Sequence, residues 1–304
     1  MSEQQSQVPT RVVVAGATGY LGKFVVNEFK RRGYWVRVLT RSIEALEKPG
    51  PFTAPGISRD EVDDVFVGEV TKPGTLKGLY DDGIDLVFSS VGISRQRDGL
   101  TFEQVDYQGN RNLMDLCGES SVRKFVYVSM LGEDQIADLA ITKAHERVVS
   151  DLKRSDLDYT IVRPSGYFSD MGVVLDMAKR GRVWLVGDGN NRFNPIHGQD
   201  LAAACADAAE GDARVVEAGG PDVLTQRQVA ELAFDVLGKS DGKISQIPDW
   251  LVRGAVRFIG LLSTQFGDLA DFIATAGDVD AVAPAVGKTS LRSYFEELRD
   301  SSHA

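Results

Sequence analysis

A glycine-rich turn near the N-terminus is the first feature of this sequence that could do chemistry. Gly16, Gly19 and Gly22 follow the apolar run 12–14 in the spacing G-x-x-G-x-x-G, and the segment 23–30 after them has helical spacing. Between a strand and a helix, Gly16 allows a tight exit from the strand, Gly19 lets backbone N–H groups approach a pyrophosphate, and Gly22 lets the helix pack close to the sheet. The positive dipole end of the helix then faces the phosphates. This arrangement predicts a bound dinucleotide.

The residues after the second apolar run, 35–39, bear on which dinucleotide would bind. A site for NAD has a carboxylate at this point, which binds the ribose 2′-hydroxyl. Here the chain continues with Thr40, Arg41 and Ser42 and offers no Asp or Glu. Arg41, with Thr40 or Ser42 and with help from Arg37 in the same run, could hold a 2′-phosphate through charge-assisted hydrogen bonds. The sequence therefore favours NADP(H), while NAD(H), with Arg41 as a solvated surface residue, stays open.

Apolar runs alternate with amphipathic segments at a steady spacing along the first half of the chain. The runs lack a polar face, as strands covered on both faces do. This alternation predicts βαβ units and hence an α/β fold with a doubly wound parallel sheet. The expected strands are 11–15, 35–39, 62–67, 85–90, 124–129 and 159–164, and the expected helices are 20–32, 43–48, 73–80, 101–118 and 136–154.

The texture of the sequence changes after Pro164, which indicates a smaller unit beside the sheet. The expected elements there are helix 170–180, strand 182–186, helix 200–210 with Asp200 as its N-cap, strand 215–218, helix 226–237 capped by Thr225, and helix 288–299. His197, just before one of these helices, is expected to make a structural hydrogen bond. The predicted organisation is a disordered lead-in (1–10), a dinucleotide-binding Rossmann core (11–165, with returning segments 191–219), a substrate-side subdomain (166–190 and 220–299) and a frayed tail (300–304).

Composition argues against several classes of protein. The 304 residues carry a formal net charge of −10, and such an acidic surface argues against non-specific binding of nucleic acid. The sequence has no uncharged apolar stretch long enough to span a membrane and no apolar signal-peptide core, so a cytoplasmic protein is expected. Cys117 and Cys205 are expected to be buried thiols, and no metal site is expected because neither they nor the histidines have metal-ligand spacing. The oligomeric state stays open.

Short motifs along the chain carry a resemblance to a known family. Beyond the glycine turn they are Gly68-Glu69-Val70, Ser89-Ser90-Val91-Gly92, Val105-Asp106-Tyr107-Gln108-Gly109-Asn110, Tyr127-Val128-Ser129, Arg163-Pro164-Ser165 and Asn194-Pro195-Ile196-His197. With them the sequence resembles the atypical short-chain dehydrogenases/reductases of the NmrA-like and isoflavone-reductase-like branch, over most of residues 11–240. The motifs are not specific to any substrate.

The resemblance implies roles for individual residues. Glu69 and Val70 would lie near the adenine, and residues 89–92 would line the central portion of the cofactor. Ser129 would match the serine after the fifth strand. Lys143 would match the lysine that holds the nicotinamide ribose, and its charge would lower the pKa of a nearby acid. The predicted cofactor-binding residues are Gly16, Thr18, Gly19, Tyr20, Leu21, Gly22, Thr40, Arg41, Ser42, Glu69, Val70, Ser89, Ser90, Val91, Gly92, Ser129, Lys143 and Pro164.

The sequence departs from the family where a proton donor is expected. The usual pair is Y-x-x-x-K, and four residues before Lys143 stands Leu139, which has no acidic proton. Tyr127, Tyr167 or His145 could donate instead, or Lys143 or a water, or the protein could bind the dinucleotide without turning it over. On a helix His145 projects roughly 200° from Lys143, which argues against it. Tyr167 follows the sixth strand, at the edge where open α/β folds bind ligands, and is preferred. The predicted catalytic residues are Lys143, Ser129 and Tyr167.

Two further stretches bear on the substrate. The apolar segment 248–275 could form a lid over an apolar substrate, lie on a membrane surface, or simply pack as a subdomain. Arg95 and Arg97 could meet an anionic substrate or be solvated. The leading hypothesis is an NADPH-dependent reductase that transfers hydride to a carbonyl or an activated double bond of a small or apolar substrate. The alternative, favoured by the missing tyrosine, is a non-catalytic NADP-binding redox sensor or assembly protein. A sugar-nucleotide epimerase is disfavoured because that chemistry needs the tyrosine.

Overall fold

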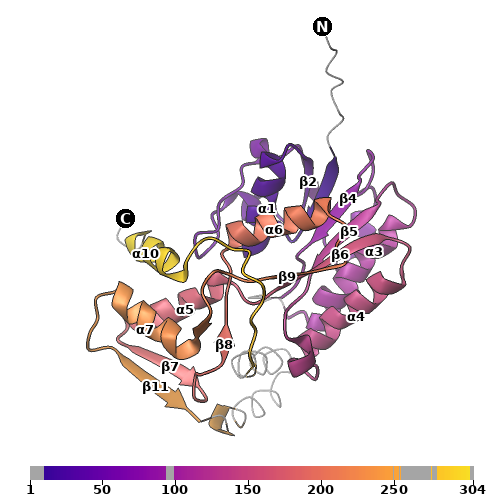
Figure 1. Cartoon of the computed structure of the whole chain (residues 1–304). Coiled ribbons are helices and arrows are strands. Elements are labelled where there is room, and N and C mark those ends of the chain that lie inside the picture. The colour runs from indigo at the N-terminus through magenta and orange to yellow at the C-terminus, as the bar shows by residue number, and fades with distance from the viewer. Residues whose placement is uncertain are drawn as a thin grey trace.

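The computed structural model of the chain describes residues 10–93, 99–248, 250–252, 254, 275 and 279–301. Three stretches discussed above lie wholly or largely outside the described residues: the lead-in 1–10, the loop with Arg95 and Arg97, and the apolar segment 248–275. Of the tail 300–304, the structure describes residues as far as 301. A parallel sheet with helices on both faces, and a smaller group of elements beside it, make up the described part (Figure 1).

The large sheet in the described part of the chain has seven parallel strands in the order β3–β2–β1–β4–β5–β6–β9. In that order the strands are β3 (Asp64–Val67), β2 (Trp35–Thr40), β1 (Arg11–Ala15), β4 (Leu86–Ser89), β5 (Lys124–Val128), β6 (Asp158–Pro164) and β9 (Val215–Ala218). This order confirms the predicted doubly wound sheet. Ala15 pairs with both Leu39 and Ser89, so β1, β2 and β4 end at the same edge. The switch point, where open α/β sheets bind ligands, lies between β1 and β4.

Helices cover both faces of this sheet. Helices α1 (Tyr20–Arg31) and α6 (Gly198–Glu210) lie on one face, and the helices between residues 103 and 154 lie on the other (Figure 1). Val12 and Val14 pack in the α1–α6 core, whereas Val13 packs in the opposite core. Fully burying one such side chain contributes about 1.5–3 kcal/mol. Because both faces are covered, the strands are largely apolar, as their sequence indicated, with exceptions such as Arg37 in β2 and Arg163 in β6.

Three predicted helices differ from the structure. The predicted helix 101–118 is a π-helix over Glu103–Gly109 followed by α3 (Asn110–Cys117). The Asn110 side chain donates to the Asp106 carbonyl at 2.6 Å, an acceptor that the backbone N–H of residue 110 uses in a regular α-helix. The predicted helix 136–154 is a 3₁₀ turn, Glu133–Ile136, and then α4 (Ala140–Arg154). The predicted helix 73–80 is only the 3₁₀ turn Pro73–Leu76, because Gly78 leaves helical geometry at φ 85°.

A second group of elements follows β6. It comprises α5 (Phe168–Lys179), β7 (Arg182–Val186), β8 (Arg192–Phe193), β10 (Leu224–Thr225), α7 (Gln226–Val236), β11 (Lys243–Ile247) and α10 (Leu291–Ser301). Strands β7 and β11 pair in parallel, and β8 and β10 pair antiparallel. Phe168, Phe234 and Tyr294 belong to a core of its own. The remaining short elements are α2 (Ile43–Glu47) and the 3₁₀ turn Arg59–Glu61, both between β2 and β3.

A buried asparagine ties distant segments of the chain together. Asn194 is fully buried, and its Nδ2 donates to the carbonyls of Gly220 at 3.0 Å and Ala283 at 2.9 Å. Its Oδ1 accepts from the Ala283 N–H at 2.9 Å. A Cβ on Gly219 would lie 2.1 Å from Asn194 Nδ2, so a glycine is needed there. The motif that begins at Asn194 therefore has a structural role in joining three segments.

The structure tests two N-caps that the sequence predicted, Thr225 and Asp200. Thr225 caps α7 in a capping box with Gln228, which confirms that prediction. The prediction that Asp200 caps α6 is wrong, because α6 begins earlier and His197 is its N-cap. The Asp200 carboxylate instead accepts from the backbone N–H groups of Lys288 and Thr289, at 2.9 and 2.8 Å.

His197 has the structural role that the sequence suggested. Its Nδ1 accepts from the Gln199 N–H at 3.2 Å, and its ring packs against Phe24, Phe168 and Tyr294. Burial lowers the pKa of His197 below its ordinary value.

We expect His197 to make the protein less stable in acid. Below about pH 6.5 the unfolded chain binds a proton at this position that the folded chain does not, because only the folded pKa is lowered. The free energy of unfolding therefore decreases as the pH is lowered, by at most about 1.4 kcal/mol per pH unit from this one proton. His197→Asn keeps an N-cap acceptor and removes the titration. Its thermal midpoint should fall less than that of the wild type between about pH 7 and about pH 5.5. His303→Asn is the control, and an equal flattening in both variants would contradict the assignment.

Candidate functional site

The glycine turn lies at the switch point between β1 and β4. Gly16 has a φ of 86°, and the Gly19 N–H closes the turn by donating to the Gly16 carbonyl at 2.9 Å. A Cβ on Gly22 would lie 2.1 Å from the Gly16 oxygen, and a Cβ on Gly16 would lie 2.7 Å from Ser90 Oγ. Positions 16 and 22 therefore accept only glycine unless their neighbours shift. The close approach sets the start of α1 against the chain that follows β4.

The first turn of α1 directs backbone N–H groups at this edge of the sheet. Gly19 is the N-cap, and no side chain caps the helix. Thr18 and Gly19 are exposed, whereas Leu21 is buried in the α1–α6 core. A helix start of this kind fits an anionic group, because its orphan N–H groups and the helix dipole favour negative charge. The geometry therefore fits the pyrophosphate of a dinucleotide.

The turn after β2 uses two of its three predicted residues locally. Thr40 Oγ1 accepts from the Ser42 N–H at 3.1 Å and donates to the Ser42 carbonyl at 2.8 Å. Ser42 Oγ in turn caps α2 by accepting from the Ala45 N–H at 3.3 Å. Arg41, between them, is exposed. Of these three residues, Arg41 is the one that offers a charged side chain at the carboxyl edge.

Arg37 does not assist Arg41, and that expectation is wrong. The Arg37 guanidinium is buried, with Nε 2.5 Å from Asp64 Oδ2 and Nη2 2.8 Å from Asp82 Oδ2. Asp82 precedes β4, which begins at Leu86. The guanidinium therefore lies towards the amino ends of the strands, away from the edge where the cofactor is expected.

The residues after β3 are held by local contacts. Glu69 pairs with Lys72 at 2.7 Å and accepts from Thr71 Oγ1 at 2.8 Å. The hydrogen bond from Lys72 lowers the pKa of Glu69. The Val70 carbonyl accepts from Asn112 Nδ2 at 2.8 Å, which ties this loop to α3. That Glu69 and Val70 lie near the adenine stays a prediction.

The four predicted residues at the end of β4 and just after it, 89–92, divide between the core and the surface. Ser89 is fully buried and donates to Asn110 Oδ1 at 2.5 Å. Asn110 Nδ2 donates to the Val91 carbonyl at 3.1 Å, and the Ser90 N–H donates to Ala15 at 3.1 Å. Gly92 is exposed. Ser89 therefore stabilises the end of β4 from within the core, whereas Gly92 is accessible to a ligand.

Ser129 and Lys143, two of the predicted catalytic residues, differ in exposure. Ser129 follows β5 and is buried, and its hydroxyl has no hydrogen-bond partner among the described residues. The Lys143 side chain is 61% exposed, with Nζ 3.9 Å from Asp138 Oδ1, and it lines a groove of about 1060 Å³ along α4. Leu139, at the position of the usual tyrosine, is the N-cap of α4 and packs in the core. The roles of Ser129 and Lys143 stay predictions.

Tyr167, the third predicted catalytic residue, packs against Tyr20. Their ring centroids are 6.3 Å apart at 77°. The Tyr20 hydroxyl accepts from the Gly198 N–H at 3.1 Å, so this side chain is directed at α6. Burial raises the pKa of both tyrosines above the ordinary value. Because a hydroxyl with a raised pKa gives up its proton less readily, this environment weakens Tyr167 as an acid. Pro164, just before it, ends β6 and is buried.

Sequence reasoning missed buried polar residues beside the site. Lys23 on α1 is 1% exposed and donates to the carbonyls of Leu46 and Lys48, both at 2.7 Å. It fastens the loop that carries α2 to the glycine-turn helix, and burial lowers its pKa. Asp106 and His145 form a buried pair at 3.1 Å. In the sequence, Asp106 stood out only as part of the family motif 105–110, and His145 only as one of the possible proton donors.

Fold and site together define a class of protein, namely a dinucleotide-binding α/β protein with its ligand edge at the β1–β4 switch point. Residues 16–212 match the model of the NAD(P)H-binding family, which is more than half of the chain. The chain therefore belongs to that family, among the atypical short-chain dehydrogenases/reductases that the sequence resembled.

Individual relatives show how broad this family is. The chain is 28% identical to divinyl chlorophyllide a 8-vinyl-reductase of Zea mays, over 95% of this chain and 79% of that protein. It is 26% identical to the photosystem II assembly factor Ycf39 of Synechocystis, over 80% of this chain and 72% of that protein. A nucleoside-diphosphate-sugar epimerase from Staphylococcus aureus has the same fold, with a TM-score of 0.71, 17% identity, and coverage of 95% of this chain and 100% of that one.

The described residues include neither a membrane-spanning helix nor a metal-binding cluster. No helix among them is both long and apolar enough to cross a bilayer. Within the same residues, no group of three or more His, Cys, Asp or Glu side chains is arranged to hold a metal ion. Cys117 and Cys205 are free and buried, and burial raises the pKa of both thiols.

Proposed function

We propose that this protein is an NADPH-dependent reductase that transfers hydride to a carbonyl or an activated double bond of a small or apolar substrate. The observation that carries the proposal is the arrangement at the carboxyl edge. A Cβ at Gly16 or Gly22 would clash within the glycine turn, and the helix that follows starts without a side-chain cap among the described residues. Arg41 is exposed at the end of the neighbouring strand. No carboxylate stands beside Arg41 at positions 40–42 to bind a 2′-hydroxyl.

The chain's own residues have distinct tasks in this proposal. The orphan backbone N–H groups in the first turn of α1, after Gly19, bind the pyrophosphate, and Arg41 binds the 2′-phosphate. The exposed backbone at Gly92 lines the central portion, and Lys143 and Ser129 act at the nicotinamide end. Reduced NADP would supply the hydride when bound, and Lys143 or a water would supply the proton that completes the reduction. Ser129, buried at the end of β5, would have to become accessible to the substrate for a direct role.

The relatives suggest which substrates to try first. The similar protein from Zea mays acts, by its name, on the 8-vinyl group of divinyl chlorophyllide a. A vinyl group conjugated to a tetrapyrrole is an activated double bond on an apolar molecule, which is the substrate class inferred from the sequence. We therefore propose conjugated vinyl groups of this kind before simple carbonyls.

Two measurements test the proposal. Binding is measured by titrating the protein with NADPH and NADH, and we expect NADPH to bind more tightly. Turnover is measured as the loss of absorbance of NADPH with divinyl chlorophyllide a and with a panel of carbonyl and alkene compounds. Consumption of NADPH with any of these confirms a reductase. Tight binding of NADPH without turnover of any of them contradicts it.

One observation favours a second candidate, a non-catalytic NADP-binding sensor or assembly protein. Leu139 occupies the position of the usual proton donor, and it is 7% exposed and packed in the core. A relative with 26% identity is named as an assembly factor rather than an enzyme. Under this candidate NADPH and NADP would bind with different effects on a partner protein. Retention of a partner only in the presence of one redox form of the cofactor would support it.

The compartment is proposed from the thiols. Because Cys117 and Cys205 are both free thiols, a reducing compartment such as the cytoplasm suits the chain. Fractionation of cells that express the protein at its natural level tests this.

A further inference from the structure

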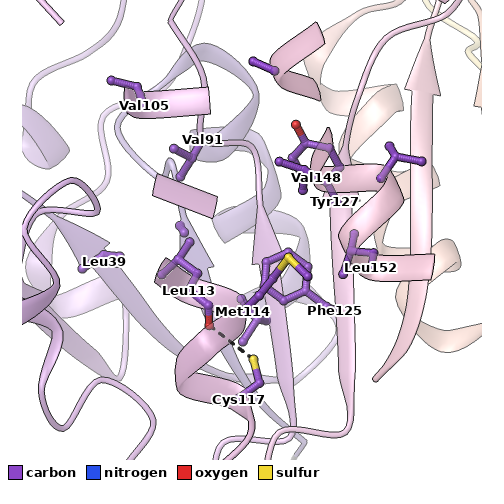
Figure 2. Close-up of a cluster of buried hydrophobic side chains, with 14 of the residues drawn as sticks. Leu39, Val91, Val105, Leu113, Met114, Cys117, Phe125, Tyr127, Val148 and Leu152 are labelled. Atoms are coloured by element: carbon purple, nitrogen blue, oxygen red, sulfur yellow. Dashed lines mark hydrogen bonds between the residues drawn. The ribbon is translucent and has the colours of Figure 1, made fainter. Parts of the chain in front are cut away.

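A buried polar cluster lies on the α3–α4 face of the sheet. It consists of Asp106 on the π-helix, His145 on α4 and Tyr127 on β5, which are 0%, 8% and 0% exposed. The angle of roughly 200° between Lys143 and His145 explains the burial, because α4 turns Lys143 to solvent and His145 to the sheet. Figure 2 shows Tyr127 among the apolar side chains of this face, with its hydroxyl directed away from Phe125.

Asp106 joins His145 to the chain that follows β4. His145 Nε2 lies 3.1 Å from Asp106 Oδ1. The Ile93 N–H donates to the same carboxylate, at 3.1 Å to Oδ2 and 3.3 Å to Oδ1. A Cβ on Gly92 would lie 2.9 Å from Asp106 Oδ1 and 3.9 Å from His145 Nε2. Carboxylate and imidazole therefore lie directly behind Gly92, the exposed residue at the switch point.

The contact with Asp106 determines which ring nitrogen of His145 carries the hydrogen. A carboxylate can only accept hydrogen bonds, so Nε2 carries the hydrogen. The bond to a charged acceptor is stronger than one between neutral groups. His145 Nδ1 is buried without a partner among the described residues, as is the Tyr127 hydroxyl. Within the described part of the chain, the only polar contact of the His145 side chain is thus the one with Asp106, which in turn holds the Ile93 N–H.

We propose that Asp106 and His145 are positioning residues that hold the backbone of Gly92 and Ile93 in place for the diphosphate–nicotinamide half of the dinucleotide. The proposal rests on the proposed cofactor site and adds two residues to it that act through the backbone. The imidazole, anchored on α4, keeps the Asp106 carboxylate from rotating, and the carboxylate keeps the Ile93 N–H turned inwards. A site held in this way needs no rearrangement when its ligand binds.

The test compares two ligands on matched variants. His145→Leu removes the donor to Asp106, whereas His145→Gln can place an amide N–H where Nε2 was. NADPH has both halves of the dinucleotide, and 2′,5′-ADP has only the adenosine half. We expect His145→Leu to weaken NADPH about tenfold while 2′,5′-ADP changes by less than about twofold. His145→Gln should recover most of the affinity for NADPH. Asp106→Leu should likewise weaken NADPH and leave 2′,5′-ADP nearly unchanged. Asp106→Asn should recover most of the affinity for NADPH, because the Asn side-chain carbonyl can still accept from the Ile93 N–H.

The outcomes distinguish positioning from a general structural role. Thermal unfolding without ligand is measured on every variant, and His145→Asn, which is too short to reach Asp106, replaces His145→Leu if the latter does not fold. Unchanged affinity for NADPH in a folded variant that lacks the donor overturns the proposal. Equal weakening of NADPH and 2′,5′-ADP also overturns it, since a distorted sheet would affect both. Because only binding is measured, an absence of turnover leaves this result intact, whereas a wild-type protein that binds neither NADPH nor NADH contradicts the proposed function itself.

Discussion

Gly22→Ala is expected to lower the free energy of unfolding by about 2–4 kcal/mol and to weaken NADPH binding more than tenfold. The added Cβ would lie 2.1 Å from the Gly16 oxygen and 2.7 Å from its carbonyl carbon. Both are backbone atoms of a turn closed by a hydrogen bond, so they cannot move aside as a flexible side chain could. Helix α1 has to shift away from the turn, and its first N–H groups move with it. Denaturant unfolding and an NADPH titration measure the two effects.

Gly19→Ala, in the same turn, separates the structural from the functional glycine. Among the described residues, the only neighbour of its Cβ within 4 Å would be the Gly16 oxygen at 3.2 Å, and Gly19 has a φ of −76°, which alanine adopts readily. The free energy of unfolding should therefore change by less than about 1 kcal/mol. NADPH binding should still weaken about tenfold, because the methyl group occupies the exposed surface that the pyrophosphate approaches.

Gly74→Ala is the control for both substitutions, since a Cβ there would have no neighbour within 4 Å in the described part of the chain. If Gly19→Ala binds NADPH as the wild type does, the pyrophosphate does not approach this turn. If Gly22→Ala is as stable as Gly74→Ala, the packing of α1 on the turn is looser than the structure indicates.

The sheet could be predicted from the sequence because its signal is local and repeated. Each strand is a short apolar run, each is followed by a turn or helix signal, and the alternation itself implies parallel strands. The glycine turn marked the first strand as the one that leads to the dinucleotide site, whereas the switch point beside it became known only from the strand order. The π-helix over Glu103–Gly109 was not predictable, because it depends on Asn110 reaching back to Asp106 and across to Val91.

The directions of side chains were harder to predict than the elements that carry them. Arg37 was expected to help Arg41, yet Asp64 and Asp82 hold its guanidinium towards the amino ends of the strands, away from Arg41. Asp200 was expected to cap α6, and His197 does so, because a neutral imidazole nitrogen can accept a hydrogen bond as a carboxylate can. Arg37 and Asp200 each bind residues far away in the sequence, which spacing alone does not show.

His145 shows how a correct geometric argument can still miss a residue. The sequence correctly predicted that His145 projects away from Lys143. The residue was missed because Lys143 was assumed to face the cofactor. Lys143 is exposed in the structure, so the opposite projection carries His145 into the sheet beside Asp106. The missing tyrosine, in contrast, was found by counting four residues back along the sequence, and the structure adds that Leu139 packs in the core there.

Arg41→Ala should weaken the binding of NADPH by about 10–100-fold and leave NADH within about twofold. A hydrogen-bonded contact between a guanidinium and a phosphate contributes about 1.5–3 kcal/mol, and NADH has no phosphate at this position. The neighbouring hydroxyls are poor substitutes, because Thr40 Oγ1 donates within the turn, and Ser42 Oγ, which caps α2, carries no charge. Titration of wild type and variant with both dinucleotides gives the ratio directly, and raising the salt concentration should narrow the difference between NADPH and NADH.

Arg41→Lys refines the assignment, because lysine keeps the charge but lacks the planar fork that binds a phosphate with two hydrogen bonds. Its affinity for NADPH should lie between those of the wild type and Arg41→Ala. Arg59→Ala removes an exposed arginine from a 3₁₀ turn elsewhere between β2 and β3, and it controls for the loss of one positive charge. Equal weakening of NADPH and NADH in Arg41→Ala would exclude a 2′-phosphate contact. A weakening of NADPH in Arg59→Ala as large as that in Arg41→Ala would assign the preference to overall charge, whereas a loss confined to Arg41 makes this residue the one that selects NADPH over NADH.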